Sequence, residues 1–268
     1  MKKKSDHANS LTFKPSNLKT LKPYCLTIAA SDTSGGAGIQ RDLKTFHDIG
    51  VNGLSVITGI TAQTKQKVFY AKALQVEQVE TQLKTILENY QISAVKIGVA
   101  FNWEIMECIS FYLKKYNQKN IVIDPILKAS DEYSFLNVES FSFMKDKFLR
   151  IADIITPNVP ELETLSEMSI SSEKELVEAG RLISKKYDAN IFAKGGHLND
   201  DGDIKDYLIK GNNTDLFSAP NKHLSDVHGT GCLISSAITA YLALGFDIKN
   251  AIVKAKEYFY SIMNSDNC

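Results

Sequence analysis

Short apolar runs alternate with longer segments of helical period along the chain from Tyr24 onward. The short runs are rich in β-branched residues, as buried strands are, and in the longer segments apolar residues recur every three or four positions. Strands and helices in alternation predict a mostly parallel sheet with helices on both faces. The predicted strands cover residues 25–30, 54–58, 94–98, 121–124, 153–156 and 190–196.

Two amphipathic helices are predicted between the first three strands, and Gly50 is a typical C-terminal stop for the first of them. Near the end of the chain, a hairpin of residues 206–210 and 215–219 is predicted. Helices follow over residues 233–245 and from about Ile248 to Met263. The apolar faces of the two early helices consist of Ile39, Leu43 and Phe46, and of Val79, Leu83, Ile86 and Tyr90.

No repeat or low-complexity stretch divides the 268 residues. We predict a flexible leader over residues 1–23, which is polar and lacks the apolar core of a secretory signal. Residues 24–268 are predicted to form a single α/β domain. No later run approaches the ~18 apolar residues that span a bilayer, so the sequence predicts a soluble protein.

The composition removes several classes of function. Thirty-one basic and 31 acidic side chains cancel, so no overall field favours nucleic acid or an anionic membrane as a partner. The four cysteines lie far apart without a C-x-x-C pair, a pattern that indicates neither a zinc knuckle nor a disulfide framework. We therefore expect reduced thiols and a cytoplasmic location.

A glycine-rich segment follows the first predicted strand, at the sheet edge where ligands of parallel sheets bind. Residues 31–38 read Ser-Asp-Thr-Ser-Gly-Gly-Ala-Gly and lead into a helix. Such glycines bring backbone N–H groups against a ligand at a helix N-terminus, and we assign Gly35 to substrate binding. A tight strand-to-helix turn is the alternative. The spacing fits neither the dinucleotide fingerprint nor a P-loop.

A second glycine turn consists of Gly229, Thr230 and Gly231 and is followed by Cys232 at a predicted helix start. Unpaired amides of such a turn suit the charge of a phosphoryl group in transfer. Cys232 would lie in the first helical turn, where the helix dipole lowers a thiol pKa and makes a thiolate base or nucleophile feasible. The alternative is a small, buried packing residue.

Carboxylates follow two further predicted strands. Asn158 and Glu161 have the spacing of a capping box. The same pair also suits hydrated Mg²⁺ near a phosphate, because magnesium keeps waters and takes few protein carboxylates. Asp124 ends the strand over 121–124 and adds a second carboxylate at this edge.

Two other polar side chains stand after predicted strands. Lys194 would place a cation near a phosphate, with a merely solvated lysine as the alternative. Gln63 carries an amide that both donates and accepts, as the edge of a planar heterocycle requires. His47, His197 and His223 lack metal-ligand spacing.

These segments, in this order, resemble the ribokinase-like kinases, and most closely the hydroxymethylpyrimidine and phosphomethylpyrimidine kinases of thiamin biosynthesis. The resemblance runs from Tyr24 to about Met263. It implies a sheet of about eight or nine mainly parallel strands, ATP as phosphoryl donor, Mg²⁺ and a homodimer. The strings that carry it are LTIAASDTSGGAGIQRDLKTF, SVITGITAQT, VKIG, IDPIL, ITPNVPELETL, KGGH and HGTGC.

The resemblance also implies roles for single residues. Gln63 matches the glutamine that reads the aminopyrimidine, and Asp42 would face the substrate hydroxymethyl group. Cys232 stands where sugar kinases of the superfamily carry an aspartate base, which points to pyrimidine or pyridoxal-type alcohols. The other implied roles are the anion hole for Gly229, Thr230 and Gly231, magnesium and phosphate binding for Asn158 and Glu161, an outer metal contact for Asp124, and phosphate binding for Lys194.

Some positions depart from the family pattern. Leu233 stands where a small hydroxyl residue usually follows the cysteine, which bears on the phosphate contacts. Val99 and Thr64 replace a common methionine and a common asparagine, which bears on the substrate pocket. Residues 128–131 lack the usual glycine of their loop.

The implied reaction transfers the γ-phosphoryl group of ATP to 4-amino-5-hydroxymethyl-2-methylpyrimidine and then to its monophosphate. A pyridoxal or pyridoxine kinase is an alternative within the class, because that ring also carries a hydroxymethyl group beside polar edges. A non-catalytic pyrimidine-binding protein is the alternative from another class.

Overall fold

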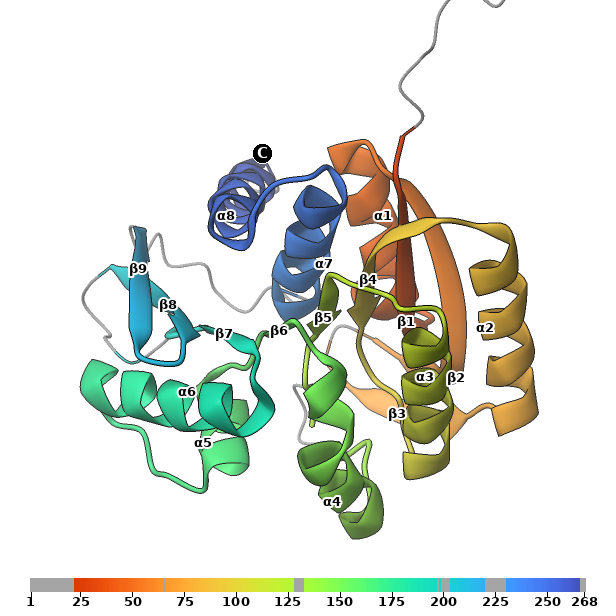
Figure 1. Ribbon diagram of the computed structural model, residues 1–268, viewed down its shortest axis with the longest axis horizontal. Coiled ribbons are helices and arrows are strands. Elements are labelled where there is room, and N and C mark those ends of the chain that lie inside the picture. Colours follow the sequence, from red (N-terminus) through yellow and green to blue (C-terminus); the bar gives the residue numbers. More distant parts are fainter. Residues whose placement is uncertain are drawn as a thin grey trace, which may run out of the picture.

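One sheet runs through the computed structural model (Figure 1). The structure describes residues 22–64, 66–127, 133–196, 198, 203–219 and 230–265. Within these residues nine strands are ordered β3-β2-β1-β4-β5-β6-β7-β8-β9. Their bounds are Tyr24–Asp32 for β1, Asn52–Gln63 for β2, Val68–Ala73 for β3, Ile92–Ile97 for β4, Ile121–Ile123 for β5, Ile154–Ile155 for β6, Asn190–Ala193 for β7, Ile204–Lys210 for β8 and Asn213–Ala219 for β9.

Neighbouring strands from β2 to β7 run parallel, whereas β3, β8 and β9 pair antiparallel with their neighbours. This confirms the predicted α/β class with a mainly parallel sheet. The predicted hairpin is also confirmed, because β8 and β9 join at Gly211, whose φ is 58°. Strand β3 was not predicted, because its exposed Phe69 and Tyr70 are adjacent and so lack the alternation of a half-buried strand.

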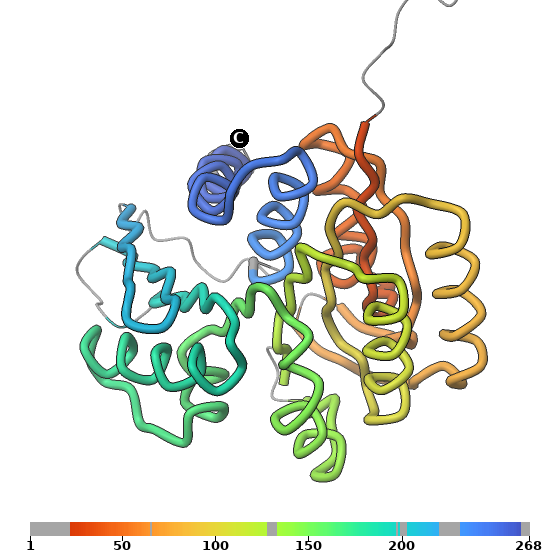
Figure 2. The backbone as a smooth tube through the Cα atoms, viewed as in Figure 1, coloured from red at the N-terminus to blue at the C-terminus, as the bar shows by residue number. Residues whose placement is uncertain are grey.

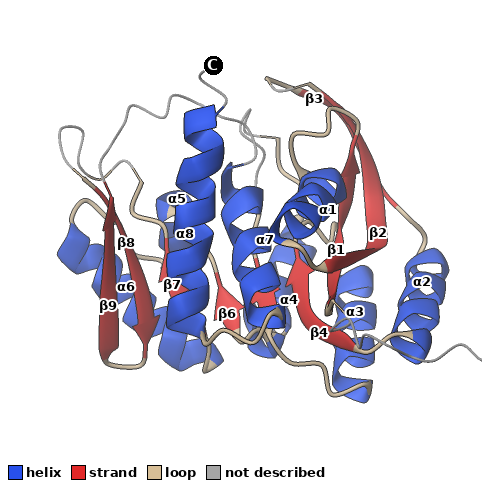
Figure 3. Cartoon of the chain, turned by 90° about the horizontal axis from the view of Figure 1, so that it is seen from above, coloured by secondary structure: helices blue, strands red, loops and turns tan. Residues whose placement is uncertain are grey.

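Helices cover both faces of the sheet (Figures 1 and 3). One face carries α1 (Gly38–Ile49), α7 (Thr230–Ala243) and α8 (Ile248–Ser265). The predicted stop of α1 is confirmed, because Gly50 caps this helix with a φ of 96°. The other face carries α2 (Val76–Asn89), α3 (Trp103–Lys115), α4 (Val138–Asp146), a 3-10 turn (Phe148–Ile151), α5 (Val159–Ser166) and α6 (Glu173–Tyr187).

Successive strand residues enter different cores. In β1, Leu26 and Ile28 pack in the core that α2 and α3 cover, whereas Cys25 lies in the core of α1, α7 and α8. Ile123 and Val122 divide in the same way in β5. Strands buried on both faces read as continuous apolar runs in the sequence, which explains why these strands were predicted correctly.

The order of the strands changes direction at β1, because β2 lies on one side of it and β4 on the other. Ligands bind outside the carboxyl ends of parallel strands at such a switch point. Helices α1 and α7, which are distant in sequence, lie side by side over this part of the sheet (Figure 2). The fold therefore brings the starts of two helices to the edge where the strands end.

The described chain begins two residues before β1. The backbone N–H of Asn52 donates to the carbonyl of Pro23 at 2.9 Å, and its side-chain amide donates to the carbonyl of Lys22 at 2.9 Å. These two residues of the expected leader thus contact the sheet, while residues 1–21 lie outside the described residues. Among the helices of the described ranges, none is long and apolar enough to cross a membrane.

Two glycines near the start of α1 offer a matched test of this packing. Gly38 has a φ of 58°, and a Cβ atom there would lie 2.3 Å from the carbonyl oxygen of Ala30. Gly35 has a φ of 72°, but a Cβ atom there would meet nothing within 4 Å. We expect Gly35→Ala to lower the free energy of unfolding by about 1–2 kcal/mol, the cost of a left-handed residue. Gly38→Ala should cost roughly 1–3 kcal/mol more, because it also overpacks α1 against β1.

Urea unfolding of the two variants measures this difference. Equal losses would contradict the close approach of Gly38 to β1.

Candidate active site

Asp32, at the carboxyl end of β1, organises the glycine-rich loop. Its buried carboxylate accepts hydrogen bonds from the backbone N–H groups of Ser34 and Ala37, each at 2.7 Å. The N–H of Gly35 donates to the Asp32 carbonyl at 3.1 Å. The loop is therefore a fixed turn that sets the start of α1. Gly35 is exposed on this turn, and its contact with a substrate stays a prediction.

The first turn of α7 lies against two of the predicted site residues. A Cβ atom at Gly231 would lie 3.4 Å from Nζ of Lys194 and 3.6 Å from Oδ2 of Asp124. Cys232 follows, with 6% of its surface exposed, and the backbone N–H of Gly38 hydrogen-bonds to its sulfur. The starts of α1 and α7 thus meet at this thiol.

Asp42 lies beneath the site rather than on its surface. Its carboxylate is wholly buried, and Nζ of Lys96 in β4 donates to its two oxygens at 3.0 and 2.9 Å. The hydroxyl groups of Thr27 and Ser236 donate to the same carboxylate at 2.6 and 2.5 Å. This arrangement is at odds with the predicted contact between Asp42 and a substrate hydroxymethyl group, because the carboxylate is enclosed by its protein partners.

Lys96 was not among the predicted site residues. The signal was a lysine inside an otherwise apolar strand, since lysine is almost never fully buried unless it is paired. Although burial opposes its charge, Asp42, Cys232 and Asp124 together raise the pKa of Lys96 above its ordinary value. Lys96 is therefore a cation in the interior of the protein.

Cys232 is not the activated thiolate that its helical position predicted. Burial raises the pKa of Cys232 to about 11, with Lys96 opposing the shift and the carboxylates of Asp124 and Asp42 adding to it. The position in the first turn of α7 is confirmed, but the expected lowering of the pKa is wrong. The reason is that loss of solvent around the sulfur outweighs the helix dipole.

Asp124 connects three strand ends with α7. Thr156, after β6, donates to its Oδ1 at 2.9 Å, and Lys194, after β7, does so at 3.2 Å. Ser235 of α7 donates to Oδ2 at 3.3 Å. Although burial disfavours the charge, Lys194 and Lys96 hold the pKa of Asp124 below its ordinary value. Lys194 is thus an ion-paired residue at the site and not merely a solvated lysine.

The capping box predicted at the start of α5 is confirmed. The N–H of Glu161 donates to Oδ1 of Asn158 at 2.8 Å, and the N–H of Asn158 donates to Oε2 of Glu161 at 2.9 Å. Burial raises the pKa of Glu161 to about 7, although Lys194 opposes the shift, and Asp124 adds to it. Glu161 is therefore a carboxylate whose charge is not fully balanced at neutral pH.

The residue types at this edge fit a hydrated magnesium ion. Mg²⁺ commonly takes one or two protein carboxylates and completes its coordination with waters and phosphate oxygens. Asp124 disfavours the charge of Glu161, and both carboxylates interact with Lys194, so a further cation would relieve the repulsion. In the part of the chain that the structure describes, no cluster of three or more His, Cys, Asp or Glu residues could hold a metal by itself.

Gln63, at the carboxyl end of β2, is joined to the glycine-rich loop. Its backbone N–H donates to Oγ1 of Thr33 at 3.0 Å, and that hydroxyl lies 3.2 Å from the Gln63 carbonyl. The end of β2 is therefore held to the glycine-rich loop, and the side chain of Gln63 is half-buried there. Its recognition of a pyrimidine stays a prediction.

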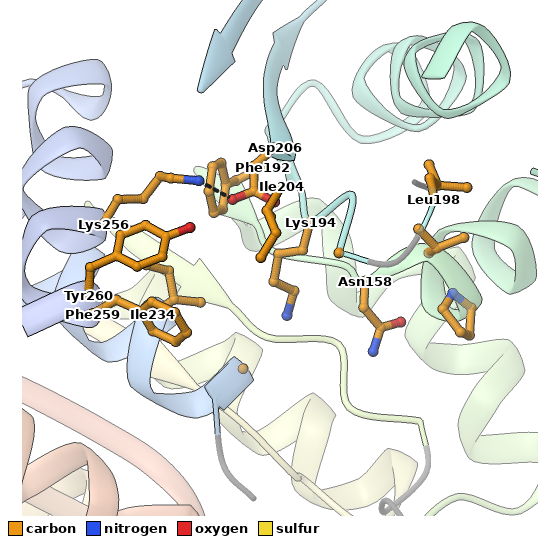
Figure 4. A pocket seen from close by; sticks show the side chains of 14 residues that line it. Asn158, Phe192, Lys194, Leu198, Ile204, Asp206, Ile234, Lys256, Phe259 and Tyr260 are labelled. Atoms are coloured by element: carbon orange, nitrogen blue, oxygen red, sulfur yellow. Dashed lines mark hydrogen bonds and ion pairs between the residues drawn. The ribbon is translucent and has the colours of Figure 1, made fainter. Parts of the chain in front are cut away.

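A cavity of about 600 Å³ lies between the β7–β8 region and the helices α7 and α8 (Figure 4). Lys194 and Asn158 occupy its middle, and Gly231 also lines it. The ion pair of Asp206 with Lys256 forms part of one wall. Apolar side chains line the same end of the cavity, namely Phe192, Ile234, Phe259 and Tyr260.

Some predicted positions lie outside the described residues, namely Gly229, His197, His223 and the loop over 128–131. Thr230 is described by its backbone alone, as the first residue of α7. The structure thus brings together Asp124, Asn158, Glu161, Lys194, Gly231 and Cys232 from the predicted set.

The sequence profile of the phosphomethylpyrimidine kinase family matches residues 32–267. This chain belongs to that family. A hydroxymethylpyrimidine/phosphomethylpyrimidine kinase of Haemophilus influenzae is 36% identical to it over 236 residues, which cover 87% of this chain and 88% of that protein.

Solved structures of phosphomethylpyrimidine and pyridoxal kinases share the fold. The crystal structure of phosphomethylpyrimidine kinase from Clostridium difficile is 38% identical with a TM-score of 0.80, and the match covers 90% of this chain and 100% of that one. A pyridoxal kinase of Staphylococcus aureus in complex with AMP-PCP and pyridoxal is 30% identical with a TM-score of 0.78, over 90% and 87% of the two chains. The ribokinase-like architecture implied by the sequence is confirmed.

The pKa of Glu161 predicts a pH-dependent stability of this phosphomethylpyrimidine kinase family member. Because folding raises this pKa from 4.5 to about 7, the folded state binds more protons than the unfolded state between these values. The stabilisation is present at low pH and is lost as the pH rises toward 7. Relative to Glu161→Gln, the free energy of unfolding of the wild type should fall by up to about 3 kcal/mol over this range.

Denaturant unfolding at a series of pH values, without nucleotide or magnesium, measures the effect. Gln at position 161 keeps an acceptor for the capping contact, so the variant isolates the charge. Parallel pH profiles of the two proteins would contradict the buried, unbalanced carboxylate.

Proposed function

We propose that this protein transfers the γ-phosphoryl group of ATP to the hydroxymethyl group of 4-amino-5-hydroxymethyl-2-methylpyrimidine, and then to the resulting monophosphate, in thiamin biosynthesis. The observation that carries this proposal is that the first turn of α7 borders the cavity. Gly231 lines the cavity and immediately precedes Cys232. A nucleotide in the cavity would therefore direct its phosphates toward Cys232.

The chemistry of the cavity supports a nucleotide as its ligand. Its volume of about 600 Å³ is typical of sites for small molecules and cofactors. The apolar end with Phe192 and Phe259 suits a nucleobase, and Lys194 offers a charged donor for a phosphate oxygen. The family membership and the AMP-PCP complex of the Staphylococcus aureus relative support ATP as the donor.

Phosphoryl transfer depends mainly on positioning and on neutralisation of charge. Lys194 and the N–H groups at the start of α7 supply positive charge where the phosphoryl group would pass. Asp124 and Glu161 would hold magnesium, which when bound neutralises phosphate charge. Cys232 would accept the hydroxyl proton of the substrate as the new O–P bond forms, which requires that its own thiol proton has first been lost to solvent.

A pyridoxal kinase is the second candidate. The specific observation is the similarity to the Staphylococcus aureus enzyme over nine-tenths of this chain. Val99 stands where the family commonly has methionine, and it follows β4 and packs with Phe101 and with Ala30 near the carboxyl end of β1. Valine is smaller than methionine, so this substitution would change the space available to the ring of the substrate.

Turnover on three substrates tests the function. We expect ADP release with hydroxymethylpyrimidine and with its monophosphate, dependent on added Mg²⁺, and a kcat/KM at least about tenfold lower with pyridoxal, a difference of roughly 1.4 kcal/mol in the barrier. Mass spectrometry of the products distinguishes the first phosphorylation from the second. Preference for pyridoxal would favour the second candidate, and ligand binding without ADP release would indicate a non-catalytic protein.

Gln63 provides a test of pyrimidine recognition. If its amide reads the edge of the ring, Gln63→Ala should weaken pyrimidine binding by about 1–3 kcal/mol, because buried polar groups lose their partner. The affinity for ATP should hardly change. Calorimetric titration with each ligand measures both effects, and the exposed Gln66 supplies the control variant Gln66→Ala. Equal losses for both ligands would indicate a structural role instead.

Three further expectations accompany this function. A homodimer, a cytoplasmic location and a single domain over residues 24–268 stay predictions.

A further inference from the structure

A wholly buried lysine lies beside the proposed reaction centre, and the mechanism above does not use it. Lys96 stands in β4 between Val95 and Ile97, and none of these three side chains is exposed. Its ammonium pairs with Asp42, which is equally buried. Burying two charges carries a large desolvation cost, and hydrophobic residues of similar volume often serve stability as well or better. A contribution to the stability of the fold therefore explains the presence of this ion pair poorly.

The pair is connected to the first turn of α7. Oδ1 of Asp42 accepts from Nζ of Lys96 at 3.0 Å and from Oγ of Ser236 at 2.5 Å. The same Ser236 hydroxyl lies 2.7 Å from the carbonyl oxygen of Cys232. Thr27 of β1 donates to the other oxygen of Asp42 at 2.6 Å. The position of the ammonium is thus set by β1, α1 and α7 together.

The space around the ammonium is also restricted. A Cβ atom at Gly98 would lie 3.1 Å from Nζ of Lys96 and 3.2 Å from Cβ of Ala29. Both distances are tighter than most Cβ contacts, so a residue larger than glycine would press on the ammonium of Lys96 and on Ala29. The absence of a side chain at Gly98 therefore leaves room for the ammonium of Lys96 beneath the site.

The charges around Cys232 come from several elements. Asp42 on α1 and Asp124 after β5 disfavour a negative sulfur, whereas Lys96 and the N–H of Gly38 favour it. Lys194, after β7, also interacts electrostatically with the sulfur. Gly38 and Asp42 lie one turn apart on α1, and Cys232 and Ser236 lie one turn apart on α7. The contacts of Gly38 with the sulfur and of Ser236 with Asp42 therefore place the Lys96–Asp42 pair one helical turn from the thiol.

We propose that Lys96 is a positioning residue for phosphoryl transfer: held by Asp42, its ammonium supplies the fixed positive charge that stabilises the thiolate of Cys232. This inference rests on the proposed function. The thiol proton of Cys232 leaves to solvent before the reaction. The thiolate then takes the proton of the substrate hydroxyl, the hydroxyl oxygen bonds to the γ-phosphorus, and the bond from that phosphorus to the leaving ADP breaks.

Alkylation of the ligand-free protein tests the charge relation without any substrate. The rate of modification of Cys232 by iodoacetamide is measured against pH, peptide by peptide, by mass spectrometry. Lys96→Met should move the midpoint of the profile upward by about one pH unit or more, and Asp42→Asn should move it downward, because the two residues act on the thiolate with opposite signs. Cys108, half-buried on α3, is the internal control, and its profile should not move.

Opposite shifts separate an electrostatic role from a structural one, because general loosening of the site would move both variants in the same direction. If Lys96→Met fails to fold, the double variant Lys96→Met/Asp42→Asn is compared with Asp42→Asn, and the added change must raise the midpoint. An unmoved midpoint, or shifts of the same sign, overturns the proposal.

Steady-state kinetics connect the thiolate to catalysis. Lys96→Met should lower kcat by about 10²-fold or more, as the loss of effective proton transfer does, and shift the rise of kcat to higher pH. The KM for ATP should stay within about twofold, because the lysine does not contact the nucleotide cavity. If the alkylation profile shifts but kcat is unchanged, Lys96 does not contribute to phosphoryl transfer and the proposal is overturned. A wild type that turns over no substrate would instead overturn the proposed function and leave the alkylation result standing.

Discussion

The buried carboxylate of Asp124 is the interaction on which the rest of the site depends. A charge removed from water is costly unless it is paired and hydrogen-bonded, and Asp124 meets this requirement through Thr156, Lys194 and Ser235. These partners follow β6, follow β7 and lie on α7. Satisfying one carboxylate therefore holds three strand ends and helix α7 in one arrangement, and in it Gly231 lies beside Lys194.

The charged groups around Asp124 suit an anionic ligand that binds together with a cation. The described site contains the buried or half-buried cations Lys96 and Lys194 and the buried carboxylates Asp42, Asp124 and Glu161. Glu161 is the least balanced of them, because burial raises its pKa to about 7. A proton there, or a magnesium ion beside it, would relieve the excess negative charge. The carboxylates and Lys194 thus have complementary tasks toward metal and phosphate.

Local signals predicted much of the fold and part of the site. The stop of α1 at Gly50, the capping box of Asn158 with Glu161 and the position of Cys232 in a first helical turn depend on a few neighbouring residues. Such short stretches encode the hydrogen bonds within one helical turn and the spacing of apolar residues along one strand. The parallel order of the strands follows from alternation with helices. Strand β3 lacked a period of this kind and was not predicted.

The sequence by itself determined the elements, the residue types at the strand ends and the family to which they point. Only the tertiary structure decided the partners and the burial of the charged groups. Asp42 and Ser236 are 194 positions apart, and Asp124 and Lys194 are 70 apart, so no local pattern could pair them. The ionisation of Cys232 depends on the same long-range packing, because its pKa reflects how much water the folded chain excludes from the sulfur.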